Sequence, residues 1–236
     1  MSTPSKTRDN FLLEPCTPAD VEGMLSVYLA AFAPDYFSSF TFPATIAPAE
    51  RQGWARARFL KTFSTPEIHN LKISDTSVTP PRIVAWARWG FPHVLDAAEK
   101  ERRRAEKELA DAAGSAWPRG ANLEICDLKF GGIHAARERN VDWERDYIVH
   151  LLQTHPEYQK KGLARWLLDD VLERVDVEGR RCHIEATKDG LPLYRKLGFR
   201  ETEVIEVDLR RWGGDRTGKN WVMVREPRGK EEEKSG

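Results

Sequence analysis

Residues 147–164 constrain the fold more than any other part of the chain. The stretch begins inside a predicted strand, residues 144–154, whose centre is apolar at almost every position, as in a strand buried on both faces. Pro156 ends this strand, and an amphipathic helix follows Gly162. A strand that leads through a glycine-containing turn into a helix points several free backbone N–H groups at one place, where the helix dipole adds partial positive charge. The stretch therefore predicts an α/β protein with an anion-binding turn, unless the turn is an ordinary connection without a ligand.

Two motifs are similar to those of a known family. Residues 151–164 read L-L-Q-T-H-P-E-Y-Q-K-K-G-L-A and contain the spacing Q-x-x-G-x-A, and residues 193–199 read L-Y-R-K-L-G-F. Together they resemble the acetyl-CoA-binding signature and the later helix motif of the GCN5-related N-acetyltransferase (GNAT) superfamily. The wording L-Q-T-H-P-E-Y-Q is also similar to that of many uncharacterised fungal members.

The resemblance implies a GNAT fold over residues 11–226. This is a mixed α/β (α+β) architecture, in which helices flank a mostly antiparallel sheet whose central strands splay apart. Residues 93–141 are longer than the corresponding connection of a minimal GNAT domain and predict a helical insertion. The polar residues 1–10 and the charged tail, residues 227–236, are predicted to be disordered.

Charge and cysteine content exclude several other classes. The formal net charge is zero, with 37 basic and 37 acidic side chains, so no overall field recruits nucleic acid or an anionic membrane. The three cysteines are widely separated and predict neither a disulfide framework nor a metal site. The first ten residues lack the apolar core of a secretion signal, and we expect a cytoplasmic protein without a metal cofactor.

By resemblance, the chain is an acyltransferase that transfers the acetyl group of acetyl-CoA directly to an amine within a ternary complex. The family's central strand binds the pantetheine arm, which corresponds here to Leu152, Gln153 and Thr154. The family's pyrophosphate turn corresponds to seven consecutive residues: Gln159, Lys160, Lys161, Gly162, Leu163, Ala164 and Arg165. The two lysines also read as ordinary solvent-facing side chains.

Two residues are candidates for proton transfer. Tyr194 matches the tyrosine that serves many GNAT enzymes as general acid toward the departing thiolate; the alternative is a packed aromatic side chain. His150, conspicuous in an apolar strand, is the candidate general base; the alternative is a core histidine. The weaker substitutes for His150 are Glu144, Asp146 and Glu185. The family's usual asparagine is replaced by the run Thr187-Lys188-Asp189-Gly190.

The acceptor is left open. The aromatic residues in the predicted loop 37–48 suggest a small molecule with an apolar or aromatic group, although they could equally pack against the core. A peptide or protein N-acetyltransferase and a non-catalytic sensor or scaffold that binds acyl-CoA are the alternatives. The sequence does not distinguish a monomer from a homodimer.

Overall fold

The computed structural model describes residues 5–112 and 117–229, whose strands form one eight-stranded sheet. The strand order is β1-β2-β3-β4-β5-β6-β8-β7, and the neighbours β5 and β6 pair in parallel while the other pairs are antiparallel. The strands are β1 (Lys6–Arg8), β2 (Phe11–Pro15), β3 (Ile68–Asp75), β4 (Arg82–Gly90), β5 (Tyr147–Thr154), β6 (Cys182–Ala186), β7 (Arg200–Asp208) and β8 (Thr217–Arg225). The predicted fold class is confirmed.

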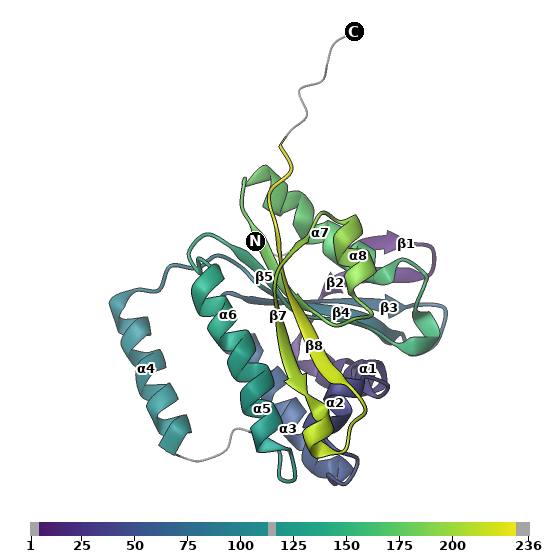
Figure 1. Cartoon of the computed structure of the whole chain (residues 1–236). Coiled ribbons are helices and arrows are strands. Elements are labelled where there is room, and N and C mark those ends of the chain that lie inside the picture. Colours follow the sequence, from purple (N-terminus) through teal and green to yellow (C-terminus); the bar gives the residue numbers. More distant parts are fainter. Residues whose placement is uncertain (1–4, 113–116, 230–236) are drawn as a thin grey trace.

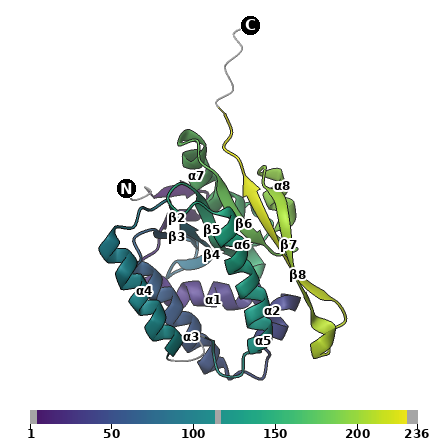
Figure 2. The ribbon, with the colours of Figure 1, turned by 60° about the vertical axis from the view of Figure 1, so that its left-hand side comes forward.

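Helices cover both faces of the sheet (Figures 1 and 2). The α-helices are α1 (Val21–Phe32), α2 (Tyr36–Thr41), α3 (Pro48–Lys61), α4 (Ala97–Ala112), α5 (Leu123–Cys126), α6 (Gly132–Asn140), α7 (Leu163–Val177) and α8 (Leu191–Lys196). Helices α7 and α8 lie on one side of the sheet, and α1, α2 and α3 lie on the other. None of the helices in the described ranges is long and apolar enough to span a bilayer.

Strand β4 separates two hydrophobic cores. Because side chains alternate along a strand, Ala85, Ala87 and Trp89 pack in the core under α7, whereas Trp86 packs in the core under α1 and α3. The indole N–H of Trp86 donates a hydrogen bond of 2.9 Å to the carbonyl of Met24 on α1. The same alternation places Arg88 with Trp86 on the side of α1.

The prediction of disorder for residues 1–10 is wrong for part of that range. Lys6–Arg8 forms β1, which pairs antiparallel with β2. The ammonium of Lys6 also lies 2.9 Å from the carboxylate of Asp170 on α7. The polar composition of residues 1–10 does not reveal these partners, because they lie far away in the sequence. Residues 1–4 lie outside the described residues.

The predicted disordered tail is wrong for Arg228. Its backbone N–H donates to Asp176 over 2.8 Å, and its guanidinium donates to the carbonyl of Leu197 over 3.1 Å. The carboxylate of Asp176 also receives two hydrogen bonds of 2.7 Å from the buried guanidinium of Arg225. Residues 230–236 of the predicted tail lie outside the described part of the chain.

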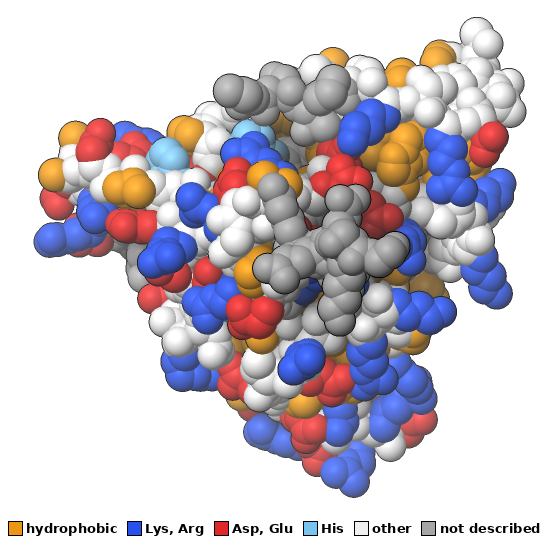
Figure 3. Space-filling view, turned by 90° about the horizontal axis from the view of Figure 1, so that it is seen from above, with side chains coloured by type: hydrophobic (Ala, Val, Ile, Leu, Met, Phe, Trp, Pro, Cys, Tyr) orange, Lys and Arg blue, Asp and Glu red, His pale blue; other side chains and the backbone are white. Residues whose placement is uncertain are grey.

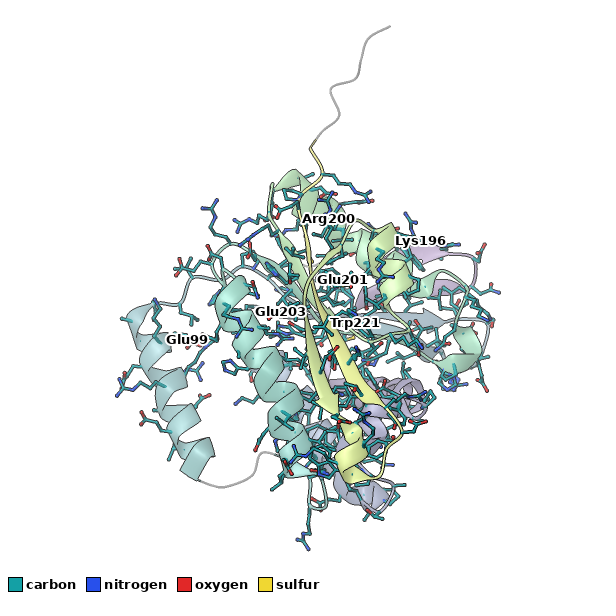
Figure 4. The ribbon with its side chains drawn as sticks, viewed as in Figure 1. Glu99, Lys196, Arg200, Glu201, Glu203 and Trp221 are labelled. Carbon is teal, nitrogen blue, oxygen red and sulfur yellow. The ribbon has the colours of Figure 1, made fainter. Side chains whose placement is uncertain are left out.

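Residues 93–141 form the helices α4, α5 and α6, with a π-helical turn (Asp127–Gly131) between α5 and α6. Helix α4 is attached through the guanidinium of Arg103, which donates to both carboxylate oxygens of Glu67 over 2.6 and 2.9 Å. Helix α6 is attached to β7, where Glu203 accepts hydrogen bonds from Arg139 and Asn140 (Figure 4). The helical character predicted for this segment is therefore present.

The predicted loop 37–48 contains helix α2. Asp35 caps its N-terminus by accepting a hydrogen bond of 2.7 Å from the backbone N–H of Ser38. The sequence left open whether the aromatic residues of this segment line a pocket or pack against the core, and the structure shows both. Phe37 and Phe40 pack with Ile125 and Leu209, whereas Phe42 lines a cavity described below.

Candidate active site

Strands β5 and β6 separate in the middle of the sheet. They pair only at Tyr147↔Cys182, Ile148↔His183 and Val149↔Ile184, and each strand then continues without the other. A cavity of about 310 Å³, here called the splay cavity, opens where they part. Its wall includes residues of β5, β6 and α8, among them Leu152, Gln153, Thr154, Glu185 and Tyr194.

A β-bulge lies at the point of separation. Leu151 pairs with Arg88 and Val149 pairs with Trp89, so His150 is an extra residue without a partner on β4. Beyond the bulge, the N–H of His155 donates to the carbonyl of Val84 on β4 over 2.8 Å. Because successive backbone groups of a strand point to opposite edges, the N–H groups of Thr154 and Leu152 point to the open edge.

The turn before α7 forms a second, adjoining cavity. Lys160 and Gly162 have φ angles of +63° and +78°, and Gly162 immediately precedes the first residue of the helix. The turn cavity, of about 210 Å³, is lined by Thr154, Tyr158, Gln159, Lys160, Gly162, Leu163, Ala164, Arg165 and Leu193. A Cβ atom built on Gly162 would lie 3.6 Å from the guanidinium of Arg8 on β1. This places a cation beside the turn that is predicted to bind an anion, and the sequence alone did not reveal it.

The structure brings the predicted binding residues together. Leu152, Gln153, Thr154 and Gln159 line the splay cavity, and the remaining candidates other than Lys161 line the turn cavity. The ammonium of Lys161 lies 4.8 Å from the ring centre of Tyr158 instead. The side-chain amide of Gln153 and the hydroxyl of Thr154 are buried without hydrogen-bond partners among the described residues. Unpaired buried polar atoms are costly, so these atoms fit a ligand that carries amide groups.

Tyr194 of α8 lines the splay cavity from the side of β6. Its ring packs against Phe199, with 5.8 Å between ring centres, and lies so close to Gly190 that a Cβ there would be 2.5 Å from Cε2. Burial raises the pKa of the Tyr194 phenol well above its ordinary value. The phenol therefore stays protonated at neutral pH and can donate a proton or a hydrogen bond.

His150 lines the splay cavity and also a third cavity on the side of α1. A Cβ on Gly90 would lie 2.6 Å from Nε2 of the imidazole, so this glycine makes room for the ring. Burial, and then the positive charges of Arg137 and Arg88, hold the pKa of His150 well below its ordinary value. The imidazole is therefore neutral at neutral pH and can accept a proton, although only as a weak base.

Of the weaker candidate bases, Glu185 alone lies in these cavities. Its carboxylate accepts two hydrogen bonds from the guanidinium of Arg137, over 3.0 and 2.5 Å. Asp146 instead bonds His183 over 2.9 Å and Arg181 over 2.8 Å, and Glu144 lies beside it in a separate surface hollow. The run that replaces the family's asparagine contributes Thr187 and Asp189 to the splay cavity.

The third cavity, of about 400 Å³, is here called the aromatic cavity. Its aromatic lining consists of Tyr28, Phe32, Phe42, Trp54, Phe59, Trp117 and Phe130. It shares Phe32, His150, Leu151, Glu185 and Thr187 with the splay cavity, so the two adjoin at His150. Sequence reasoning did not identify its cationic residues, although an arginine between two tryptophans, in the run Trp86-Ala87-Arg88-Trp89, is a usable signal.

Replacing Lys129 with Met is expected to raise the free energy of unfolding at pH 7 by about 1–3 kcal/mol. Lys129 is 7% exposed, and burial lowers its pKa to about 8. The unfolded chain keeps an ordinary lysine pKa of about 10.4. Between these two pKa values the unfolded state binds more protons than the folded state, so the free energy of unfolding rises with pH. Below pH 8 the lysine is charged in both states, and the full cost of burying its charge is present.

Urea unfolding at pH 7 and pH 10 measures this effect. The stabilisation by Met should shrink toward pH 10, where the wild-type lysine is neutral in the folded state. Lys219→Met, at an exposed position of β8, is the control and should change stability by no more than about 0.5 kcal/mol. Destabilisation at Lys129 at both pH values would show that its aromatic contacts outweigh the cost of burial.

Comparisons with known proteins agree with this fold. Residues 127–208 match the model of the acetyltransferase (GNAT) domain family. The matched segment extends from the end of α5 to β7, so it contains β5, the turn, α7 and Tyr194, and also α6 from the predicted insertion. The prediction of an acetyltransferase is confirmed. No curated protein matches the chain by sequence.

Solved structures share the fold over most of the chain. An agmatine N-acetyltransferase, in the apo form of a mutant, has 16% identity and a TM-score of 0.61 over 92% of this chain and 100% of that one. The polyamine N-acetyltransferase of Drosophila melanogaster, which forms N-acetylagmatine, has 16% identity and a TM-score of 0.59 over 92% and 99%. The PaiA N-acetyltransferase of Thermoplasma acidophilum, in complex with coenzyme A, has 12% identity and a TM-score of 0.50 over 92% and 99%.

Proposed function

We propose that this acetyltransferase transfers the acetyl group of acetyl-CoA directly to the amine of a small molecule. The observation that carries the proposal is the continuity of the three cavities. The turn cavity shares Thr154, Gln159, Ala164 and Leu193 with the splay cavity, and the splay cavity adjoins the aromatic cavity at His150. A thioester that enters from the turn and an amine that enters from the aromatic side would therefore meet near His150 and Tyr194.

The residues of the turn and of β5 fit coenzyme A. Backbone N–H groups at the N-terminus of α7 suit the diphosphate, and Lys160, Arg165 and Arg8 can supply positive charge. The open edge of β5 and the amide of Gln153, which has no partner among the described residues, suit the amide groups of the pantetheine arm. The PaiA relative was solved with coenzyme A, which supports the same choice of ligand.

Transfer requires one bond to form and one to break. The neutral amine attacks the thioester carbonyl carbon, the C–N bond forms, and the C–S bond breaks. The carbonyl oxygen gains negative charge on the way and needs hydrogen-bond donors, a role suited to the N–H groups on the open edge of β5. The amine loses a proton, for which His150 is the candidate acceptor, and the thiolate gains one, for which Tyr194 is the candidate donor.

Replacing His150 with Ala is expected to lower kcat about tenfold, less than a well-matched general base contributes, because the buried imidazole is a weak base. The affinity for CoA should change little, since His150 does not line the turn cavity, where the diphosphate would bind. For the wild type, kcat/KM should rise with pH as the acceptor amine deprotonates, without an inflection near pH 6.5.

Steady-state rates from pH 5.5 to 9, with CoA affinity from calorimetry, test this expectation. An inflection near pH 6.5 that disappears in His150→Ala would show an imidazole with an ordinary pKa. An equal loss of CoA affinity in the variant would assign His150 a structural role.

The release of free CoA thiol from acetyl-CoA in the presence of amines tests the proposed function itself. We expect amine-dependent release, with the acetylated amine identified by mass spectrometry. Tight CoA binding without any amine-dependent release, for small amines and peptides alike, would instead support a non-catalytic acyl-CoA-binding module.

A further inference from the structure

The aromatic cavity concentrates positive charge. Its lining contains the cations Arg58, Arg88, Lys129 and Arg137, while Glu185 is its acidic residue among the described side chains. Glu185 is already paired with Arg137. The face shown in Figure 3 is different, because basic and acidic side chains are interspersed over it. The surplus of cations is therefore a property of this cavity, whereas the chain as a whole has no net charge.

Arg88 is the most informative of these cations. It is 9% exposed, and its Nε donates a hydrogen bond of 3.0 Å to the side-chain oxygen of Asn70. Its Nη2 is buried without a hydrogen-bond partner, and no carboxylate within the described ranges forms an ion pair with it. A buried guanidinium with an unsatisfied N–H is costly unless something binds it. The missing partner is best supplied by an anionic group of the ligand.

Lys129 adds a second buried cation to the same cavity. Its ammonium lies 4.2 Å from the ring centre of Phe37 and 5.4 Å from that of Phe130. The carboxylate of Asp35 is near enough to favour its charged form, but Asp35 lines the neighbouring cavities and not this one. The cavity therefore keeps its positive character.

The positions of the charges indicate how an acceptor would lie. Arg88 is paired across the sheet with Leu151, directly beside His150, and the charges of Arg88 and Arg137 both act on that imidazole. The anionic group would therefore sit next to the reacting amine. Elsewhere in the lining of this cavity, Trp117 and Phe130 stack with 4.6 Å between ring centres, and Phe42 and Trp54 pack beside them, which suits an apolar ring.

We propose, on the basis of the acetyltransferase function proposed above, that the acceptor is an α-amino acid with an aromatic or large apolar side chain. Its carboxylate binds Arg88, with Lys129 contributing charge, and its side chain lies among the aromatic residues of the cavity. A polyamine or agmatine, of the kind on which the structural relatives act, brings a second positive charge into a cavity that already holds several.

Matched pairs of amines test the role of the carboxylate. The wild-type chain is incubated with acetyl-CoA and one amine at a time. Two pairs compare an amino acid with its decarboxylated amine: phenylalanine with phenethylamine, and tryptophan with tryptamine. Agmatine and spermidine are tested in addition. We expect kcat/KM for each amino acid to exceed that of its decarboxylated partner by at least about tenfold, the size of one charge-assisted hydrogen bond. Equal or faster acetylation of the decarboxylated amines or of the polyamines would overturn the proposal while leaving the acetyltransferase function intact.

Binding of the products separates this proposal from the chemistry. Calorimetry with N-acetylphenylalanine and N-acetylphenethylamine, in the presence of CoA, should show the carboxylate-bearing product binding at least about tenfold more tightly. Arg88→Met and Lys129→Met should each reduce that ratio, and Arg88→Lys should retain part of it. Lys129→Met keeps the test decisive if Arg88→Met fails to fold. It should fold normally, because Lys129 forms no hydrogen bond or ion pair within the described residues. A ratio near one in the wild type would overturn the proposal even if no amine were turned over.

Discussion

Replacing Gly162 with Asp is expected to weaken the binding of CoA at least about 100-fold, because it puts a carboxylate into the site where backbone N–H groups and a helix dipole favour an anion. The Cβ of residue 162 would point toward the guanidinium of Arg8, 3.6 Å away, so the new carboxylate would draw on the positive charge that the diphosphate needs. The φ angle of +78° adds strain for any residue with a side chain. Calorimetric titration with CoA measures the loss.

Gly179→Asp provides the matched control. Gly179 lies just beyond the other end of α7, has a φ angle of +62° and has no atoms within 4 Å of the position that its Cβ would occupy. The same substitution therefore carries a comparable backbone penalty without approaching the turn cavity, and CoA affinity should remain at the wild-type value. If Gly162→Asp and the wild type bound CoA with equal affinity, the diphosphate would not bind at this turn.

Replacing Tyr194 with Phe is expected to lower kcat at least about 100-fold, the usual contribution of a positioned general acid. The ring contacts with Phe199 and Gly190 remain in the variant, so both the fold and the affinity for CoA should be retained. The raised pKa of the phenol means that it holds its proton over the whole working range. Its contribution should therefore not titrate between pH 6 and 9. Single-turnover rates at saturating acetyl-CoA measure the chemical step.

Tyr147→Phe is the control for the loss of a buried phenol. The hydroxyl of Tyr147 donates a hydrogen bond of 2.9 Å to Glu178 and lies away from the three cavities, so its removal should lower stability and leave kcat unchanged. A Tyr194→Phe enzyme with wild-type kcat would contradict the role of general acid and leave Tyr194 as a packing residue.

Local sequence patterns were sufficient to locate the strand, the turn and the helix at which we propose that the cofactor binds. The apolar run of β5, Pro156 and the positive-φ glycine before α7 are short-range signals, and each was in its predicted place. The helix motif around Tyr194 was also recognisable, because Pro192 lies in the first turn of a short helix and Gly198 follows its last residue closely. Each of these features arises from residues that are adjacent in the sequence, and it depends little on the rest of the fold.

The aromatic cavity, where we propose that the acceptor binds, depends on contacts between residues far apart in the chain. Arg88 of β4, Lys129 of the π-helical turn and Trp54 of α3 meet in one cavity only because the sheet and the helices bring them together. The same reason explains the missed strand β1, whose Lys6 pairs with Asp170. Of the residues at the aromatic cavity, Arg88 could have been singled out from the sequence, because it is a charged residue within an apolar strand.

The central claim is that CoA lies with its diphosphate at the turn before α7 and its thioester arm along the open edge of β5. Backbone amide chemical shifts during a titration with CoA test it most directly. We predict the largest shifts at Leu152 and Thr154 and at residues 159–165, with small shifts at Gly179. Saturating binding whose shifts fall elsewhere, with these amides unmoved, would contradict it.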